Sequence, residues 1–257
     1  MSESTLTYAY TADTAEDQDG HGDGHNVEVV HDRLREAILC GAIPVGVPLS
    51  QVQLAQQFGV SRTPLREALR LLQREGLIES ERNRRVRVAG FSVPDLENLY
   101  AMRMTMEALA IRLTVPRLTA GDLHTLEEHL AGIEHYSMLH DYEHWRVPHR
   151  AFHRGLVAQA GERLVTLIEQ LSDHAERYRR VYTLETPGAW VAGAQEHRTI
   201  FDACIARDPA AAADRLARHY AHVALSVLVM VAAEHEPATI RTALRMVAQA
   251  ENKNTGK

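Results

Sequence analysis

The chain has 257 residues, enough for one or two domains with a packed core. Aromatic residues make up only 5% of it, and no run approaches the roughly 20 apolar residues that a membrane-spanning helix needs. The formal charge of −6 excludes a uniformly basic coat for nucleic acid. Cys40 and Cys204 lie far apart, which favours small buried residues over a disulfide framework. We expect a soluble, mainly α-helical protein of the cytoplasm, with no membrane partner.

The charge is unevenly distributed along the chain. Residues 1–26 contain six acidic residues, no Lys or Arg, and no apolar period, so we expect an acidic disordered tail. Residues 27–91 contain ten Arg against seven acidic residues, a balance of +3, whereas residues 92–257 have a balance of −3. A basic segment within an acidic chain indicates where DNA phosphates would be contacted.

The segment after the tail predicts two short helices. Apolar residues recur at helical spacing from Val27 to near Gly41. After a turn-rich connector at 43–48, Ser50 can cap a second short helix. The apolar residues of the two helices are Val30, Leu34, Ala37 and Ile38, and then Leu54, Ala55 and Phe58.

The next stretch has the pattern of a helix-turn-helix. Gly59 supplies the positive φ that a short interhelical turn needs. Ser61 or Thr63 can cap the following helix, and Pro64 falls in its first turn, where a missing N–H is tolerated. The residues of the buried stripe, spaced i, i+3, i+4 and i+7, are Leu65, Ala68, Leu69 and Leu72. The residues left on the opposite face are Arg62, Thr63, Arg66 and Arg70. This pattern predicts a recognition helix for the major groove, ending at Gly76; a merely solvated helix is the alternative.

A β-hairpin is expected directly after this helix. Residues 77–80 and 85–88 alternate like two short strands, joined by a tip at 81–84. Arg82, Arg84 and Arg85 would then lie at the tip of a wing, within reach of phosphates or the minor groove. The pattern therefore predicts a winged helix-turn-helix domain over residues 27–91.

Beyond residue 91 the periodicity is helical throughout. The helices are predicted at 93–115, 120–139, 142–160, 162–184, 188–206 and 209–234, with a further short helix after Pro237. We expect an all-α bundle of six or seven helices over residues 92–250, which binds an effector and forms the dimer, and a frayed C-terminus at 251–257.

Four histidines stand out among the fifteen in the chain. His149 and His153 are four residues apart, so they project from one face of a helix, and His197 and His219 fall on two later helices. Four imidazoles that converge from three helices could bind Zn²⁺ or Ni²⁺. A chance i, i+4 pair in a His-rich chain is the alternative.

Residues 27–91 resemble the winged-helix domain of the GntR family of bacterial transcription regulators. The matching segments are residues 34–38, 54–55, 59–69 and 75–78. The resemblance implies DNA contacts by Arg35, Ser61, Arg62, Thr63, Arg66, Arg70, Arg84 and Arg85. The chain departs from the family where Arg84 and Arg85 replace a Gly of the wing, and a side chain there would change how closely the wing approaches the minor groove.

The helical part resembles the FCD ligand domain of the FadR subfamily, through residues 149–153, 196–203 and 213–219. The resemblance implies a metal held by an Asp and three His, with His149 standing in the place of the Asp, and a small effector, often a carboxylate. Arg103 resembles an Arg that faces the effector cavity; a surface salt bridge with Glu107 is the alternative. The cluster at residues 177–180 favours a solvated face.

We therefore expect a non-enzymatic regulator that binds palindromic operator DNA as a homodimer, with repression relieved by a metabolite. The GntR-like proteins favour repression as the default mode. One alternative is a regulator for which the metal itself is the signal. Another is a metal-dependent hydrolase with a nucleic-acid-binding module, in which Glu196 would act as the base.

Overall fold

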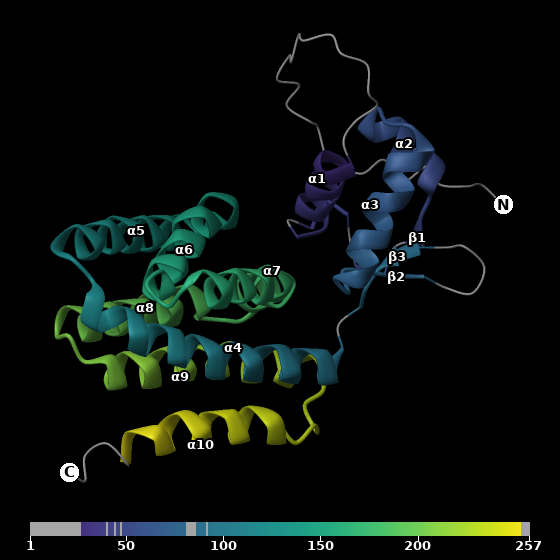
Figure 1. The fold of residues 1–257 in the computed structure, drawn as a ribbon. Coiled ribbons are helices and arrows are strands. Elements are labelled where there is room, and N and C mark those ends of the chain that lie inside the picture. The colour runs from purple at the N-terminus through teal and green to yellow at the C-terminus, as the bar shows by residue number, and fades with distance from the viewer. Residues whose placement is uncertain are drawn as a thin grey trace. The chain divides into compact units, whose positions relative to one another are not determined.

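The structure is a computed structural model, and it describes residues 27–39, 41–43, 45–46, 48–80, 86–90 and 92–252, apart from the side chains of residue 80 and residues 249–252. The expected acidic tail, the expected wing tip with Arg84 and Arg85, and residues 253–257 lie outside these ranges. Contacts divide the chain into two compact units between Gly90 and Phe91 (Figure 1), and each unit is described by itself.

The first unit contains a helix-turn-helix, as predicted. Its helices are α1 (Val27–Leu39), α2 (Gln51–Phe58) and α3 (Arg62–Arg74). The Ser50 side chain accepts from the N–H of Gln53 and caps α2, and Gly59 ends this helix with φ 65°. The N–H of Gly59 donates to the carbonyls of Ala55 and Gln56, a bonding pattern that requires this left-handed residue. Ser61 occupies the N-cap position of α3, although its side chain makes no capping hydrogen bond.

Three short strands complete the first unit: β1 (Pro48–Leu49), β2 (Ile78–Ser80) and β3 (Val86–Val88). They form an antiparallel sheet in the order β1-β3-β2, and Glu79 lies opposite Arg87 in the hairpin. The predicted hairpin is confirmed. Strand β1 was not predicted, because two residues show no alternation and a Pro is tolerated only on an edge strand.

The second unit is a bundle of seven α-helices within the described residues. Their bounds are α4 (Val93–Thr114), α5 (Ala120–Leu139), α6 (Tyr142–Val157), α7 (Glu162–Glu185), α8 (Ala189–Ile205), α9 (Pro209–Val231) and α10 (Ala238–Asn252), with a short 3₁₀ helix at Val115–Arg117. The prediction of six or seven helices is confirmed at seven. Thr119 and Asp122 form a capping box that starts α5, and Gly188 precedes α8 with φ 78°. None of the described helices is both long and apolar enough to cross a membrane.

Helix α4 is packed along α9, and α10 covers both of them (Figure 1). The pair α4–α9 is antiparallel, since the Val115 carbonyl accepts from Arg207 while Glu107 meets Tyr220. Helices α5 and α6 approach closely at two glycines. A Cβ at Gly132 would lie 3.0 Å from Pro148, and a Cβ at Gly155 would lie 2.8 Å from Leu126. This packing holds α6, which carries two of the four histidines, against the bundle.

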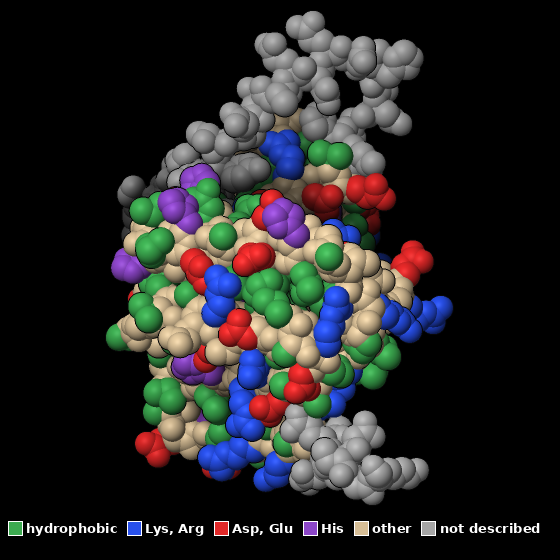
Figure 2. Space-filling model, turned by 90° about the vertical axis from the view of Figure 1, so that its left-hand side faces the viewer, with side chains coloured by type: hydrophobic (Ala, Val, Ile, Leu, Met, Phe, Trp, Pro, Cys, Tyr) green, Lys and Arg blue, Asp and Glu red, His purple; other side chains and the backbone are tan. Residues whose placement is uncertain are grey.

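The surface of the helical unit carries both signs of charge. On the face in Figure 2, Arg and acidic side chains alternate among apolar and histidine side chains, and neither sign dominates. A surface of mixed charge does not create the extended positive potential that attracts DNA.

Candidate DNA-binding helix and metal centre

Helix α3 separates its buried and exposed residues sharply. Leu65, Ala68, Leu69 and Leu72 are buried in the core of the first unit, as the spacing predicts. The exposed residues at its N-terminal end and along its outer face are Ser61, Arg62, Thr63, Arg66 and Arg70. Arg70 donates to Glu67 over 2.9 Å, so part of its charge is balanced on the helix itself. The structure thus places five of the eight expected DNA-binding residues in one accessible row.

Arg35 lies outside that row. Its Nε donates to Glu75 over 3.1 Å, and its side chain is only 17% exposed. The other oxygen of Glu75 lies 2.5 Å from Nε2 of His31. Arg35 and His31 of α1 therefore hold the residue that follows α3, and they fix the direction of the recognition helix.

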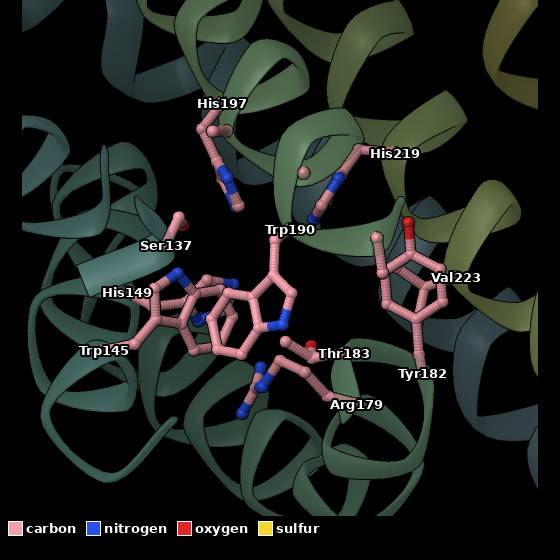
Figure 3. Close-up of a pocket in the computed structure, with 13 residues that line it drawn as sticks. Ser137, Trp145, His149, Arg179, Tyr182, Thr183, Trp190, His197, His219 and Val223 are labelled. Carbon is pink, nitrogen blue, oxygen red and sulfur yellow. The ribbon is translucent and has the colours of Figure 1, made fainter. Parts of the chain in front are cut away.

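The four expected histidines meet inside the second unit. His149 and His153 project from α6, His197 from α8 and His219 from α9, and all four are buried. One ring nitrogen of each lies within 4.8 Å of those of the others. Figure 3 shows three of them, His149, His197 and His219, directed toward a common space. The tertiary structure thus brings together side chains that are 70 positions apart in the sequence.

His219 is held by a carboxylate behind it. Its Nδ1 lies 2.7 Å from Oε2 of Glu196, and the other oxygen of Glu196 lies 2.5 Å from Nδ1 of His222. An ionised carboxylate only accepts, so Nδ1 of His219 is the donor and the Nε2 lone pair faces the cluster. Burial raises the pKa of Glu196, but its bonds to His219 and His222 outweigh this, and the net shift is downward. Glu196 therefore orients a histidine.

His153 is oriented by a chain of buried groups. Its Nδ1 lies 2.9 Å from the hydroxyl of Tyr220, and that hydroxyl donates to Glu107 over 2.5 Å. Since the Tyr220 proton is directed at the carboxylate, Nδ1 of His153 must donate, which leaves its Nε2 lone pair for the cluster. The second oxygen of Glu107 accepts from Nε of Arg103 over 2.8 Å.

The Arg103–Glu107 ion pair forms, but the expected alternative of a surface pair is wrong. Both side chains are only 1% exposed, because Tyr100 and Tyr220 cover the guanidinium from two helices. Burial alone would lower the pKa of Arg103, but Glu107 raises it and the net shift is upward, so the arginine stays charged. Arg103 is not among the described residues that line the cavity at the histidines.

Three of the four histidines are held in the neutral form by their environment. Burial lowers the pKa values of His149, His153 and His197 well below the ordinary value, and the neighbouring imidazoles and Arg179 lower them further. A neutral imidazole is the form that binds a metal. These three rings can therefore present lone pairs at neutral pH.

A small cavity of about 20 Å³ adjoins the cluster, and Arg179 lines it. The expectation that Arg179 belongs to a solvated face is wrong, because the side chain is buried and pairs with Glu176. Its neighbours behave differently: Arg177 pairs with Asp95 and Arg180 with Glu143, nearer the surface. The spacing of the sequence could have indicated that Arg179 is buried, because Ala175, Arg179 and Tyr182 are spaced i, i+4 and i+7 on the buried stripe of α7.

Three side chains of this cavity offer hydrogen-bond donors that have no partner among the described residues. They are Nε of Arg179, the hydroxyl of Tyr182 and Nε1 of Trp145. Burial, and then the charge of Glu196, raises the pKa of Tyr182 to about 12, so this hydroxyl keeps its proton. Buried donors usually find acceptors, and three of them around one cavity suit an oxygen-rich anion.

The donor set fits a borderline transition metal. Four neutral nitrogens suit Zn²⁺, Ni²⁺ or Cu²⁺, whereas Mg²⁺ and Ca²⁺ prefer oxygen. Nε2 of His153 and Nε2 of His197 are 3.0 Å apart. Two nitrogens bound to one Zn²⁺ at about 2.0 Å in tetrahedral geometry would be roughly 3.3 Å apart, so a small outward shift of one ring would suffice. The residues present therefore fit a metal.

Comparison with known proteins agrees with both units. Residues 26–88 match the profile of the gntR family of bacterial regulatory proteins, and residues 98–222 match that of the FCD domain. The HTH-type transcriptional repressor GlaR of Escherichia coli is 29% identical over 199 residues, which cover 72% of this chain and 88% of GlaR. An uncharacterized HTH-type regulator from an unstable DNA locus of Streptomyces ambofaciens is 30% identical, over 66% of this chain and 72% of that protein.

A solved structure shares the fold. The structure of McbR/YncC from E. coli superposes with a TM-score of 0.69 at 23% sequence identity, and the match covers 79% of this chain and 97% of that one. The winged helix-turn-helix, the seven-helix unit and the two family profiles lead to one conclusion. The chain is a member of the gntR family of bacterial regulatory proteins, and its helical unit is an FCD domain.

Proposed function

We propose that this protein is a cytoplasmic transcription repressor of the FadR subfamily, in which a metal and a small carboxylate at the four histidines control binding to operator DNA. The convergence of four buried imidazole nitrogens within 4.8 Å carries the proposal. A homodimer would present two copies of α3 to a two-fold symmetric operator. The relative GlaR, a repressor by name, supports repression as the mode.

The proposed DNA contacts start from the exposed row on α3. Arg62, Thr63 and Arg66 lie at the end of the helix that enters a major groove, with Ser61 before them and Arg70 one turn further on. Arg35, on α1, is proposed to exchange its hydrogen bond to Glu75 for one to a DNA phosphate. The wing residues Arg84 and Arg85 are proposed to contact the backbone. Each phosphate contact would add affinity and salt dependence.

His149, His153, His197 and His219 would hold the metal. When bound, the metal would act as a Lewis acid that anchors an oxygen of the effector. Glu196 and Tyr220 would keep two of the rings in the required tautomer. Arg179, Tyr182 and Trp145 would donate to the remaining carboxylate oxygen. Arg103 would support the site from behind, through Glu107 and Tyr220.

The hydrolase alternative is less well supported. Glu196, the expected base, lies behind His219 and is bonded to two histidines. Catalytic zinc sites usually have three protein ligands, whereas four histidines converge here. If the metal alone were the signal, adding it to the metal-free protein would change operator affinity without any organic ligand.

The DNA-binding role can be tested on Arg66. Binding sequences selected from random duplex DNA should be two-fold symmetric, and Arg66→Ala should weaken binding to them by more than about tenfold without unfolding the chain. Arg74→Ala, at the exposed C-terminal end of the same helix, is the matched control and should change affinity little. Equal affinities for the wild type and Arg66→Ala would refute the proposed contact.

The metal can be tested on untagged protein purified without added metal. Elemental analysis should find about one Zn or Ni per chain, and His153→Ala should lose it. His124→Ala is the control, since that side chain is 73% exposed on α5 and far from the cluster in sequence. Metal-free wild-type protein that also fails to take up Zn²⁺ or Ni²⁺ would exclude the proposed centre.

A further inference from the structure

Two hollows meet at Trp190. The inner one is the cavity of about 20 Å³ at the histidines, and the outer one is an open hollow of about 540 Å³ on the surface of α5 and α8. Ser137, Trp190 and Ala194 line both. In the view of Figure 3 the indole of Trp190 is drawn between His197 and His219 above it and Arg179 below it. Trp190 is therefore a shared wall between the metal-binding cluster and the surface.

The inner hollow is too small for a whole effector. A cavity needs roughly 10–15 Å³ of such volume to hold one water, so 20 Å³ holds little more than a single oxygen group. Pockets for small molecules usually measure about 300–1,000 Å³, a range that includes the outer hollow. An effector whose head group reaches the histidines must therefore extend past Trp190 into the outer hollow.

The lining of the outer hollow indicates the chemistry of that extension. Met138 and Val191 line it together with Trp190, and they are 76% and 73% exposed. Arg198 also lines it, but both its Nε and its Nη2 already donate to Glu134, over 3.0 and 2.7 Å. Because this guanidinium is paired, the hollow offers apolar surface rather than a second anion site.

Trp190 is placed where a small change of backbone can move it. It lies in the first turn of α8, two residues after Gly188, whose φ of 78° is a conformation that only glycine adopts freely. Its ring contacts Trp145 and His140, at centroid distances of 5.7 and 5.5 Å, and makes no hydrogen bond that would fix it among the described residues. Aromatic contacts of this kind can be exchanged for contacts with a ligand.

We propose that the outer hollow is a second compartment of the effector site, which takes the uncharged, apolar tail of a carboxylic acid whose head group passes Trp190. This inference rests on the proposed function, since the head group is the carboxylate proposed there. The effector is then an acid with a ring or alkyl chain rather than a short hydroxy acid. Met138, Trp190 and Val191 would select it.

The test compares two acids that differ only in the tail. Calorimetric titration of the metal-containing protein with acetate and with phenylacetate should give at least roughly tenfold tighter binding of phenylacetate, because the phenyl ring is removed from water. Val191→Asp places a charge in the outer hollow and should remove this advantage while acetate affinity stays the same. The new carboxylate lies in the first turn of α8, where the helix dipole favours it, so the fold is retained.

Val229→Asp is the matched control, since Val229 is 67% exposed on α9 and lies outside the lining of this hollow; both affinities should be unchanged. Equal binding of the two acids would overturn the second compartment and leave the proposed function standing. The second compartment would also be overturned if Val191→Asp weakened the binding of both acids equally. It would be overturned as well if this variant dissociated an oligomer in sedimentation, because the hollow would then be a subunit contact. Binding of neither acid would contradict the carboxylate effector and this inference together.

Discussion

The two units differ in whether they bury polar side chains. Every buried residue that the structure describes in the first unit is apolar, and the arginines described there lie partly or fully exposed. Among its described side chains, the second unit buries twelve that are polar or charged. They are Glu97, Arg103, Glu107, Thr114, Ser137, His149, His153, Glu176, Arg179, Thr183, His197 and His219.

The difference fits what each unit is proposed to bind. DNA is larger than the unit that meets it, so the contacting groups must be on the surface, and an apolar core can support them. A metal and a small anion would be enclosed by the protein, so their contacting groups would have to lie inside and would need partners that offset their loss of hydration. The bonds from Glu107 and Glu176 to their arginines supply those partners.

The largest expected effect comes from breaking the buried pair. Glu107→Ala leaves Arg103 charged in the core and should lower the free energy of unfolding by about 3–5 kcal/mol. Urea denaturation at pH 7 measures this. The double variant Arg103→Met/Glu107→Leu removes both charges and should recover most of the loss, so a double variant as unstable as the single one would contradict the explanation.

Removing the support of one histidine should cost less. Tyr220→Phe takes away the acceptor for Nδ1 of His153, and metal affinity should fall by about 10–100-fold. Competition with a chromophoric chelator gives the affinity. Tyr136→Phe removes the same hydroxyl group from a tyrosine of α5 that is not part of the cluster, and it should leave the metal affinity unaltered. Equal metal affinities of the wild type and Tyr220→Phe would show that another contact sets the tautomer of His153.

Gly193 offers a change with opposite effects on stability and binding. It lines the inner cavity within α8, and a Cβ placed there has no atom within 4 Å. Gly193→Ala should raise the free energy of unfolding by about 0.5–1 kcal/mol, because alanine is the better helix former. The added methyl group should at the same time weaken effector binding in calorimetry. If stability and binding both stay at the wild-type level, the glycine has no role in keeping the cavity open.

The smallest effect is expected for the exposed pair of the first unit. Glu67 and Arg70 have side chains that are 41% and 61% exposed, so water already solvates both charges. Glu67→Ala should change the free energy of unfolding by less than about 0.5 kcal/mol. When Glu67→Ala and Glu107→Ala are measured under the same conditions, the two losses compare an Arg–Glu pair on the surface with an Arg–Glu pair in the core. A loss above about 1 kcal/mol would show that the two units differ less than burial indicates.

Local features were determined by the sequence. The turn at Gly59, the cap at Ser50, the stripe on α3 and the bounds of most helices follow from hydrogen bonds and contacts within a few residues of each other. The His149–His153 pair is local in the same way, because one helix turn sets its geometry. Strand β1 was missed because its two residues become a strand only by pairing with Val86 and Arg87, nearly forty positions away.

Burial and partners were decided by the tertiary structure. Arg103 and Glu107 look like a surface pair along α4, and become a core pair only because α9 places Tyr220 over them. Arg179 enters the cavity because of the helices packed on its face of α7. Likewise, Glu196 meets His219 only across the α8–α9 contact. The sequence by itself thus determined the helices and the types of ligand. Which polar groups are sealed from water, and which partner each then has, depends on how distant segments pack.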